Sequence, residues 1–228
     1  MIKLWWGLVR LGFRLLYNEF AWTYDTVAWL VSGGEWRAWQ RTAFEALNLA
    51  TGSVILELAH GTGNLHIDLL SSGYKCVGID RSRAMGRIAM RKIRRARFVP
   101  HLVNATAGAV PLATASVDGV VCTFPSEFLT LPATLSEVRR VLRPGARYAI
   151  VVHGVLLRGW WRPLLNVLFQ ATGQGGIQQD YVPTVETLNF RYERLVSAFT
   201  SAGLYCDVIP MLTPRGYAVV ATGGSMPQ

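Results

Sequence analysis

The stretch Ser53-Val-Ile-Leu-Glu-Leu-Ala-His-Gly-Thr-Gly-Asn-Leu65 decides the fold of this chain. Its apolar run, Val54 to Leu58, is typical of a buried strand, and a helical pattern follows the second glycine. Gly61 and Gly63 can adopt positive φ and let a ligand approach the backbone closely. Glu57 lies near the strand's carboxyl end, where open α/β sheets bind their ligands. The stretch therefore predicts a strand, a glycine turn and a helix that bind a nucleotide-like ligand.

The loop departs from two common phosphate-binding patterns. A dinucleotide fingerprint needs a third glycine at the position of His66, and the Lys-Ser/Thr ending of a P-loop is absent. A second predicted strand, Lys75–Asp80, ends in a carboxylate that lies 17 residues after Gly63. This is close to the separation at which an acidic residue reaches ribose hydroxyls. Together the two signals favour a nucleoside-containing ligand other than a dinucleotide.

Length and composition indicate one α/β domain with an anionic partner. The 228 residues can bury a sizeable core, and the mean hydropathy of +0.26 is high for a soluble protein. A net charge of +9 favours phospholipid, nucleic acid or an acidic substrate as partner. The sequence has no nucleic-acid-binding motif, so no nucleic acid is expected, and no apolar run is long enough to span a membrane. Three cysteines in predicted strands are expected to be core thiols: Cys76, Cys122 and Cys206.

Three segments combine basic residues with apolar or aromatic ones. Residues 1–22 place three basic side chains on one stripe of a helix whose other positions are mostly Trp, Leu and Phe. Residues 81–97 contain eight basic residues and no acidic one, and 158–169 contain a second pair of tryptophans. We expect these segments to make peripheral contact with an anionic membrane, in the cytoplasm. A lid that packs over the domain is the alternative for 1–22, and a solvated helix face is the alternative for 81–97.

The first loop resembles motif I of the class I S-adenosyl-L-methionine (SAM)-dependent methyltransferases, usually Asp/Glu-x-Gly-x-Gly-x-Gly. Glu57, Gly61 and Gly63 match it, and Ala59 replaces the first glycine. Residues 135–147 resemble the helix, turn and strand that follow motif II. The resemblance covers about residues 24–222. It implies a SAM cofactor and a Rossmann-like, seven-stranded, mostly parallel sheet with helices on both faces, preceded by N-terminal amphipathic helices.

This resemblance also implies a division of the chain. Residues 1–45 are expected to form an N-terminal helical segment, and 46–228 the SAM-binding domain. An insertion at 154–189 is expected to shape the acceptor site. The segment Tyr24–Arg41 is similar to the one that precedes the SAM domain in the ubiquinone/menaquinone C-methyltransferases. The bacterial phospholipid N-methyltransferases are a second similar branch.

The expected cofactor residues come from this resemblance. In the family a tyrosine lies over the cofactor, and an aspartate after the third strand binds the adenine amino group. Here Thr106 stands in the aspartate's place, so adenine binding is expected to depend on the backbone of Ala107. The expected set is Tyr24, Glu57, Ala59, Gly61, Gly63, Asp80, Arg81, Thr106, Ala107 and Phe124.

Methyl transfer requires a positioned acceptor and, for a phenol, ring carbon or amine, removal of a proton. His153 ends the predicted fifth strand, and Glu127 lies on the loop after the fourth. These two and Tyr24 are the candidate catalytic residues, and His60 is expected to affect only the shape of the binding loop. No metal site is predicted. A structural role at a strand end is the alternative for His153, and a helix cap is the alternative for Glu127.

Three functions remain open from the sequence. The first is an enzyme of lipid metabolism that methylates a lipophilic small molecule, either a quinone-type ring or a phospholipid amine, at the membrane surface. The second is a soluble natural-product methyltransferase whose residues 1–22 form a lid. The third is a non-catalytic membrane-binding module that retains the fold, suggested by the departures at Ala59 and Thr106.

Overall fold

The computed structural model describes residues 7, 11–12, 15–16, 18–158 and 181–225. The expected helix over 1–22 and the basic aromatic segment 158–169 lie largely outside these residues. Both therefore stay predictions, as does the assignment of 154–189 as an acceptor-site insertion.

Seven described strands form one sheet in the spatial order β3-β2-β1-β4-β5-β7-β6. The neighbours from β3 to β5 pair in parallel, whereas β7 is antiparallel to both β5 and β6. This confirms the mostly parallel sheet expected from the sequence. The strands are β1 (Val54–Leu58), β2 (Lys75–Ile79), β3 (Leu102–Val103), β4 (Val117–Thr123), β5 (Leu142–Leu156), β6 (Leu204–Thr213) and β7 (Gly216–Ser225).

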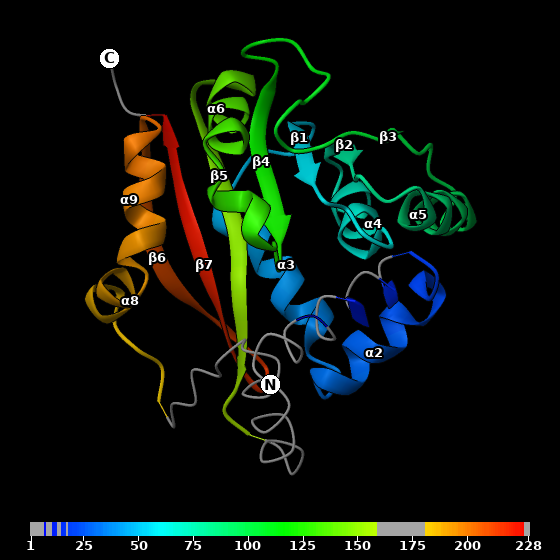
Figure 1. Cartoon of the computed structure of the whole chain (residues 1–228), viewed down its shortest axis with the longest axis horizontal. Coiled ribbons are helices and arrows are strands. Elements are labelled where there is room, and N and C mark those ends of the chain that lie inside the picture. The colour runs from blue at the N-terminus through cyan, green and yellow to red at the C-terminus, as the bar shows by residue number, and fades with distance from the viewer. Residues whose placement is uncertain (1–6, 8–10, 13–14, 17, 159–180, 226–228) are drawn as a thin grey trace.

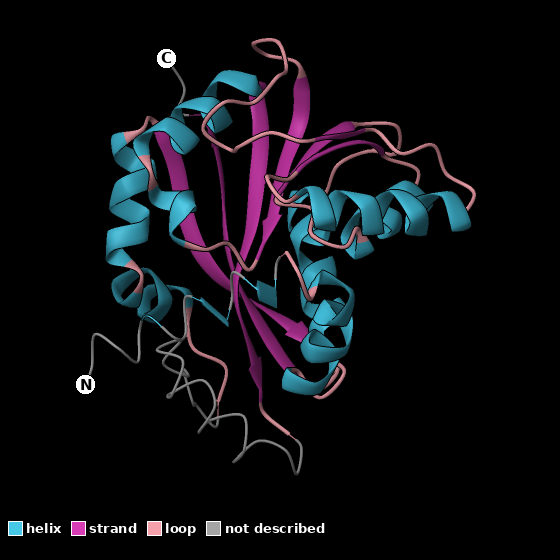
Figure 2. Ribbon diagram, turned by 45° about the vertical axis from the view of Figure 1, so that its right-hand side comes forward, coloured by secondary structure: helices cyan, strands magenta, loops and turns pink. Residues whose placement is uncertain are grey.

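Helices cover both faces of the sheet (Figures 1 and 2). One face carries α3 and α4, with α5 beyond them next to β3, and the opposite face carries α6, α8 and α9. The helices are α2 (Tyr24–Val31), α3 (Trp36–Leu47), α4 (Asn64–Ser71), α5 (Arg83–Arg95), α6 (Pro132–Val141), α8 (Val185–Arg191) and α9 (Glu193–Ser201). Two short 3-10 helices are η1 (Ala21–Thr23) and η2 (Glu127–Thr130).

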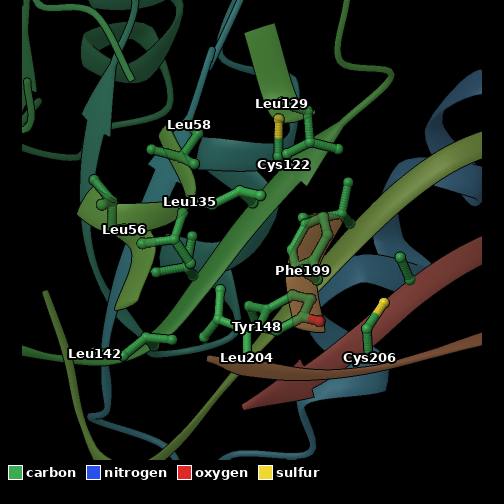
Figure 3. Close-up of a cluster of buried hydrophobic side chains, with 14 of the residues drawn as sticks. Leu56, Leu58, Cys122, Leu129, Leu135, Leu142, Tyr148, Phe199, Leu204 and Cys206 are labelled. Atoms are coloured by element: carbon green, nitrogen blue, oxygen red, sulfur yellow. The ribbon is translucent and has the colours of Figure 1, made fainter. Parts of the chain in front are cut away.

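The pleat of β1 divides its side chains between two cores. Leu56 and Leu58 join the cluster under α6 and α9, where Figure 3 shows them with Phe199 and Tyr148. Ile55 faces the other way and packs with the buried residues of α3 and α4. The three cysteines are free and buried, so the expected core thiols are confirmed.

The sequence predicts a third strand over Phe98–Val103, but β3 is limited to Leu102–Val103. Arg97 has a left-handed backbone (φ 64°), and the Phe98 amide donates to the carbonyl of Ile93 in α5, 3.1 Å away. These residues therefore complete the end of α5. Pro100 has no N–H for a ladder bond, and pairing with β2 begins at Leu102.

Candidate functional site

The loop between β1 and α4 has left-handed backbone at alternate positions. Ala59 has φ 53°, Gly61 has φ 54° and Gly63 has φ 80°. Glycine adopts this conformation freely, whereas an L-residue with a Cβ loses about 1–2 kcal/mol. The turn itself therefore favours glycine at all three motif positions, and Ala59 occupies the first of them under strain.

The last two glycines have different roles. A Cβ added to Gly63 would lie 2.9 Å from the Cβ of Ala89, so Gly63 permits the close packing of α4 on α5. A Cβ added to Gly61 would meet no atom within 4 Å. Gly61 therefore borders open space, as a backbone that receives a ligand must.

Asp80 connects the end of β2 to this loop. Its Oδ2 accepts a hydrogen bond from the Gly61 amide at 2.9 Å, and its Oδ1 accepts one from the Ser82 amide at 2.7 Å. Each oxygen of a carboxylate can accept two bonds, so both retain capacity for a pair of hydroxyls. The side-chain amide of Asn104 donates to the Asp80 carbonyl at 2.8 Å. Asp80, His60 and Asn104 line a cavity of about 320 Å³ between α5 and β3.

Glu57 faces α4 from beneath the loop. Its Oε2 lies 2.8 Å from Nδ1 of His66, and both side chains are buried. The same ring nitrogen lies 3.3 Å from Sγ of Cys76, whose pKa burial raises well above its usual value. Glu57 is thus held by a buried polar cluster and does not line the cavity beside Asp80.

A network centred on Asp25 ties α2 to the loop and to α5. Its Oδ1 accepts from the Thr62 hydroxyl at 2.6 Å and from the Asn64 amide at 2.9 Å, and its Oδ2 accepts from Lys92 at 2.8 Å. Burial alone would raise the pKa of Asp25, but the bonds from Lys92, Thr62 and Asn64 outweigh it and lower the pKa. The neighbouring Tyr24 is thereby positioned next to the motif I loop.

Aromatic side chains form a wall at the carboxyl end of β4. Phe124 stacks on Trp36, with ring centroids 4.0 Å apart and planes at 29°. Tyr24 meets Trp36 edge-on at 6.2 Å, and Trp39 lies edge-on to both Trp36 and Phe124. Phe124 has φ 51°, a strained conformation that is common at functional sites.

Among the described residues, three unsatisfied polar atoms accompany this wall, on Trp36, Trp39 and Gln40. Gln40 lies one turn of α3 after Trp36, and its Nε2 donates to the Thr123 hydroxyl at 3.2 Å. Within the described part of the chain, Oε1 of Gln40 and the Nε1 atoms of Trp36 and Trp39 are buried without a hydrogen-bond partner. Each such atom lowers stability by about 1–3 kcal/mol.

The candidate bases differ in burial. His153 is half-buried in β5, where the register with β7 shifts between Val151 and His153, and burial lowers its pKa. Glu127 is exposed at the start of η2. His60 is buried, with its Nδ1 2.9 Å from the Gly61 carbonyl. His153 is therefore the candidate whose neutral, proton-accepting form is favoured.

The remaining expected cofactor residues, Arg81, Thr106 and Ala107, do not line the cavity beside Asp80. Thr106 is exposed after β3, and its carbonyl accepts from the Ala109 amide at 3.1 Å. Arg81 is exposed and lines a different cavity, next to Glu19. Their roles in cofactor binding stay predictions.

Comparison with known proteins identifies the central part of the chain. Residues 55–145 match the family described as "Methyltransferase domain". Residues 55–145 are therefore similar to a methyltransferase domain. The match contains the motif I loop and Asp80, and it ends at residue 145, within the helix, turn and strand after motif II.

Curated relatives of this methyltransferase domain include enzymes of quinone biosynthesis. A ubiquinone/menaquinone biosynthesis C-methyltransferase of Syntrophotalea carbinolica is 32% identical over 141 residues, which cover 60% of each chain. A demethylmenaquinone methyltransferase of Symbiobacterium thermophilum is 28% identical, covering 59% of this chain and 56% of the relative. The chain thus spans only part of these relatives. The expected likeness to this branch of the SAM-dependent methyltransferases is confirmed.

Solved structures share the fold of this chain. A SAM-dependent methyltransferase from Aquifex aeolicus superposes with a TM-score of 0.58 at 16% identity, covering 87% of this chain and 96% of that one. A Haemonchus contortus phosphoethanolamine N-methyltransferase, solved with phosphomonomethylethanolamine and S-adenosylhomocysteine, gives 0.61 at 15% identity, covering 92% and 57%. At such identities the likeness concerns the fold.

Several site residues were missed by the sequence reasoning. Trp36, Gln40 and Asn104 carry no motif of their own, and only the fold brings them to the carboxyl edge. Asp25 had a signal, because it follows Tyr24 in the segment similar to the quinone C-methyltransferases. Its partner Lys92 was interpreted only as part of the basic run at 81–97.

Proposed function

We propose that this chain transfers a methyl group from SAM to a lipophilic acceptor and that the acceptor is a quinone-type ring. The observation that carries the proposal is the pairing of Asp80 with the open Gly61 backbone at the carboxyl edge of the sheet. A phospholipid amine is the second acceptor class that the sequence allows. The enzyme is proposed to work in the cytoplasm, in peripheral contact with the membrane.

The residues present fit SAM. The Asp80 oxygens have lone pairs left for the two ribose hydroxyls, because each accepts only one backbone amide. Gly61 leaves space for the ligand against the loop. The Asp25 network positions Tyr24 beside the loop, where it can cover the bound cofactor.

When bound, SAM supplies a methyl group on a cationic sulfur that is open to in-line attack. The protein's task is then to hold the acceptor in line and to remove its proton. The wall of Tyr24, Trp36 and Phe124 presents aromatic faces for a planar ring and excludes water. His153, kept neutral by burial, is the proposed proton acceptor.

Two observations support a ring acceptor over an amine. The stacked rings of Trp36 and Phe124 supply an aromatic surface of the kind that binds planar rings. The curated relatives named above act on quinones by their names.

The test is transfer of labelled methyl from SAM in detergent micelles that contain either a demethylated quinol or phosphatidylethanolamine. We expect labelled quinol and unlabelled phosphatidylethanolamine. Label in the phospholipid alone would show that the acceptor is a phospholipid amine. If SAM binds but neither lipid is labelled, both proposed acceptors are refuted.

The Asp25 network also favours a lid role for the N-terminal segment, as in a soluble natural-product methyltransferase. It fixes α2 to the cofactor loop whether or not a membrane is present. Methyl transfer to a water-soluble aromatic acceptor, with the quinol unmodified, would support this second function. Failure of the folded protein to bind SAM would instead indicate a non-catalytic module.

A further inference from the structure

The outer face of α5 consists of arginines. Met85, Ala89 and Ile93 form the buried stripe of this helix. On the opposite side, four exposed arginines recur at intervals of three or four residues: Arg83, Arg87, Arg91 and Arg94. In the described ranges no acidic side chain pairs with any of the four, and Arg83 bonds only the Asn104 side chain. Like charges at this spacing weaken a helix unless an anion neutralises them.

Three arginines border a cavity at the start of this face. The cavity has a volume of about 460 Å³ and is lined by Asn18, Glu19, Arg81, Arg83, Ala84 and Arg87. Glu19 is the one carboxylate among its lining residues. Guanidinium groups bind phosphate oxygens in a bidentate manner, so the cavity suits a phosphate group.

Exposed aromatic side chains lie on two helices that adjoin α5. Trp22 in η1 is 74% exposed and Trp29 in α2 is 60% exposed, with Phe20 and Leu30 near 50%. The 3-10 helix η1 contacts α5, and the Asp25–Lys92 ion pair joins α2 to α5. Aromatic and basic side chains on adjoining helices form the kind of surface that binds a bilayer interface.

We propose that the surface formed by η1, α2 and the outer side of α5 docks on an anionic phospholipid bilayer, with a headgroup phosphate in the Arg81–Arg83–Arg87 cavity. This deepens the proposed function, on which it rests for the lipophilic acceptor. A soluble phosphate would account for the cavity but not for the exposed tryptophans beside it. RNA would account for the arginines, but the exposed Leu30 has no role in RNA binding.

Vesicle flotation with the full-length protein tests the proposal. Wild-type protein is expected to float with vesicles of phosphatidylcholine and phosphatidylglycerol, and much less with phosphatidylcholine alone. Each arginine near an anionic surface contributes roughly a factor of five, so R87Q/R91Q/R94Q is expected to weaken binding about 100-fold. The matched control R139Q/R191Q/R194Q removes the same charge from exposed arginines on α6, α8 and α9, and is expected to change binding little.

A second pair of variants tests the aromatic part. W22A/W29A is expected to weaken vesicle binding at least tenfold, while F190A/L212A, which removes equally exposed apolar side chains elsewhere, is expected to leave it unchanged. Equal losses in each variant and its control would overturn the proposal, because they would show a non-specific effect of charge or hydrophobicity.

Two further measurements on the same proteins identify the source of the anion. Calorimetry with inorganic phosphate that shows tight binding, without vesicle flotation, would assign the cavity to a soluble phosphate and overturn membrane docking. Retention by a single-stranded RNA without flotation would overturn it in favour of nucleic acid. SAM calorimetry separates this inference from the proposed function: SAM binding without flotation refutes the docking surface alone, and flotation without SAM binding refutes the enzyme alone.

Discussion

The two halves of the carboxyl edge are built in different ways. On the proposed cofactor side, the side chain of Asp80 accepts hydrogen bonds from the backbone amides of Gly61 and Ser82. These residues lie within a contiguous stretch of fewer than 30 residues. On the proposed acceptor side, Trp36, Phe124 and His153 come from α3, the end of β4 and β5. The first half depends on turn geometry, which a short motif encodes. The second depends on side chains that only the folded sheet brings together.

This comparison explains why the cofactor is easier to infer than the acceptor. A loop that must take left-handed φ at alternate residues restricts the sequence to small residues, and the restriction is visible. An aromatic wall imposes no spacing along the chain. Substitutions at Asp80 and Gly61 should therefore change SAM affinity, whereas substitution of His153 should change the rate of methyl transfer.

Removal of the Asp80 carboxylate is expected to have the largest effect. Asp80→Ala deletes the acceptor of two backbone amides and of the ribose hydroxyls, so SAM affinity should fall about 1,000-fold by calorimetry. Asp118→Ala is the matched control at the opposite end of β1, where the carboxylate accepts from the Val54 amide at 2.8 Å and pairs with Arg143. It should lower stability and leave SAM affinity unchanged. Near-normal SAM affinity of Asp80→Ala would show that SAM does not bind at Asp80.

A side chain at Gly61 is expected to block the SAM cradle, by which we mean the open space at the Gly61 backbone beside the Asp80 carboxylate. Gly61→Val fills the open space and forces a β-branched residue to φ 54°, so SAM affinity should fall about 100-fold or more. Gly61→Ala, which adds one methyl group, should lose less. If both variants bind SAM like the wild type, the ligand does not approach this backbone.

His153 tests the acceptor half alone. His153→Gln is expected to lower kcat about 100-fold while SAM affinity stays within twofold, because a general base contributes to the transfer step only. Its pKa is lowered, so the neutral base persists below pH 6.5 and activity is lost only as pH falls through that lower pKa. A parallel loss of SAM affinity would indicate a structural role instead.

The fold could largely be predicted from sequence, as could the position of Gly61 and Asp80 at the carboxyl edge of the sheet. Periodicity located most strands, and the binding of the cofactor at this edge stays a prediction. The third strand is shorter than the sequence predicts, because the Phe98 amide donates a hydrogen bond back to α5. That contact depends on the tertiary structure, which local composition does not determine. Gln40 and the stacking of Trp36 on Phe124 were not predictable, since they depend on the packing of α3 over β4 and β5.

Asp68 joins the two halves, because it fixes α3 to α4. It accepts bidentate bonds from Arg37, at 2.7 and 3.0 Å, and two more from Arg41 at 3.1 Å. Burial alone would raise the pKa of Asp68, but these bonds lower it on balance. Asp68→Asn should therefore lower the free energy of unfolding by about 2 kcal/mol at pH 7. The wild type loses this advantage as pH falls below 3.8 through the lower folded pKa, so urea titrations of the two proteins should converge there.

The smallest expected effect is a gain in stability. Ala59→Gly removes a Cβ from a residue at φ 53°, which relieves about 1–2 kcal/mol of strain, while the added freedom of the unfolded chain offsets part of it. A net increase of about 0.5–1 kcal/mol in the free energy of unfolding is expected from urea titration. A decrease would show that the methyl group of Ala59 makes packing contacts worth more than the strain.

The central claim is that the Gly61–Asp80 cradle binds SAM. Its most direct test is calorimetric titration of SAM into the folded full-length protein. We predict saturable binding of one SAM per chain, competed by S-adenosylhomocysteine and not by NAD. Absence of heat and of any ligand-induced rise in Tm, with the protein folded by circular dichroism, would contradict the account.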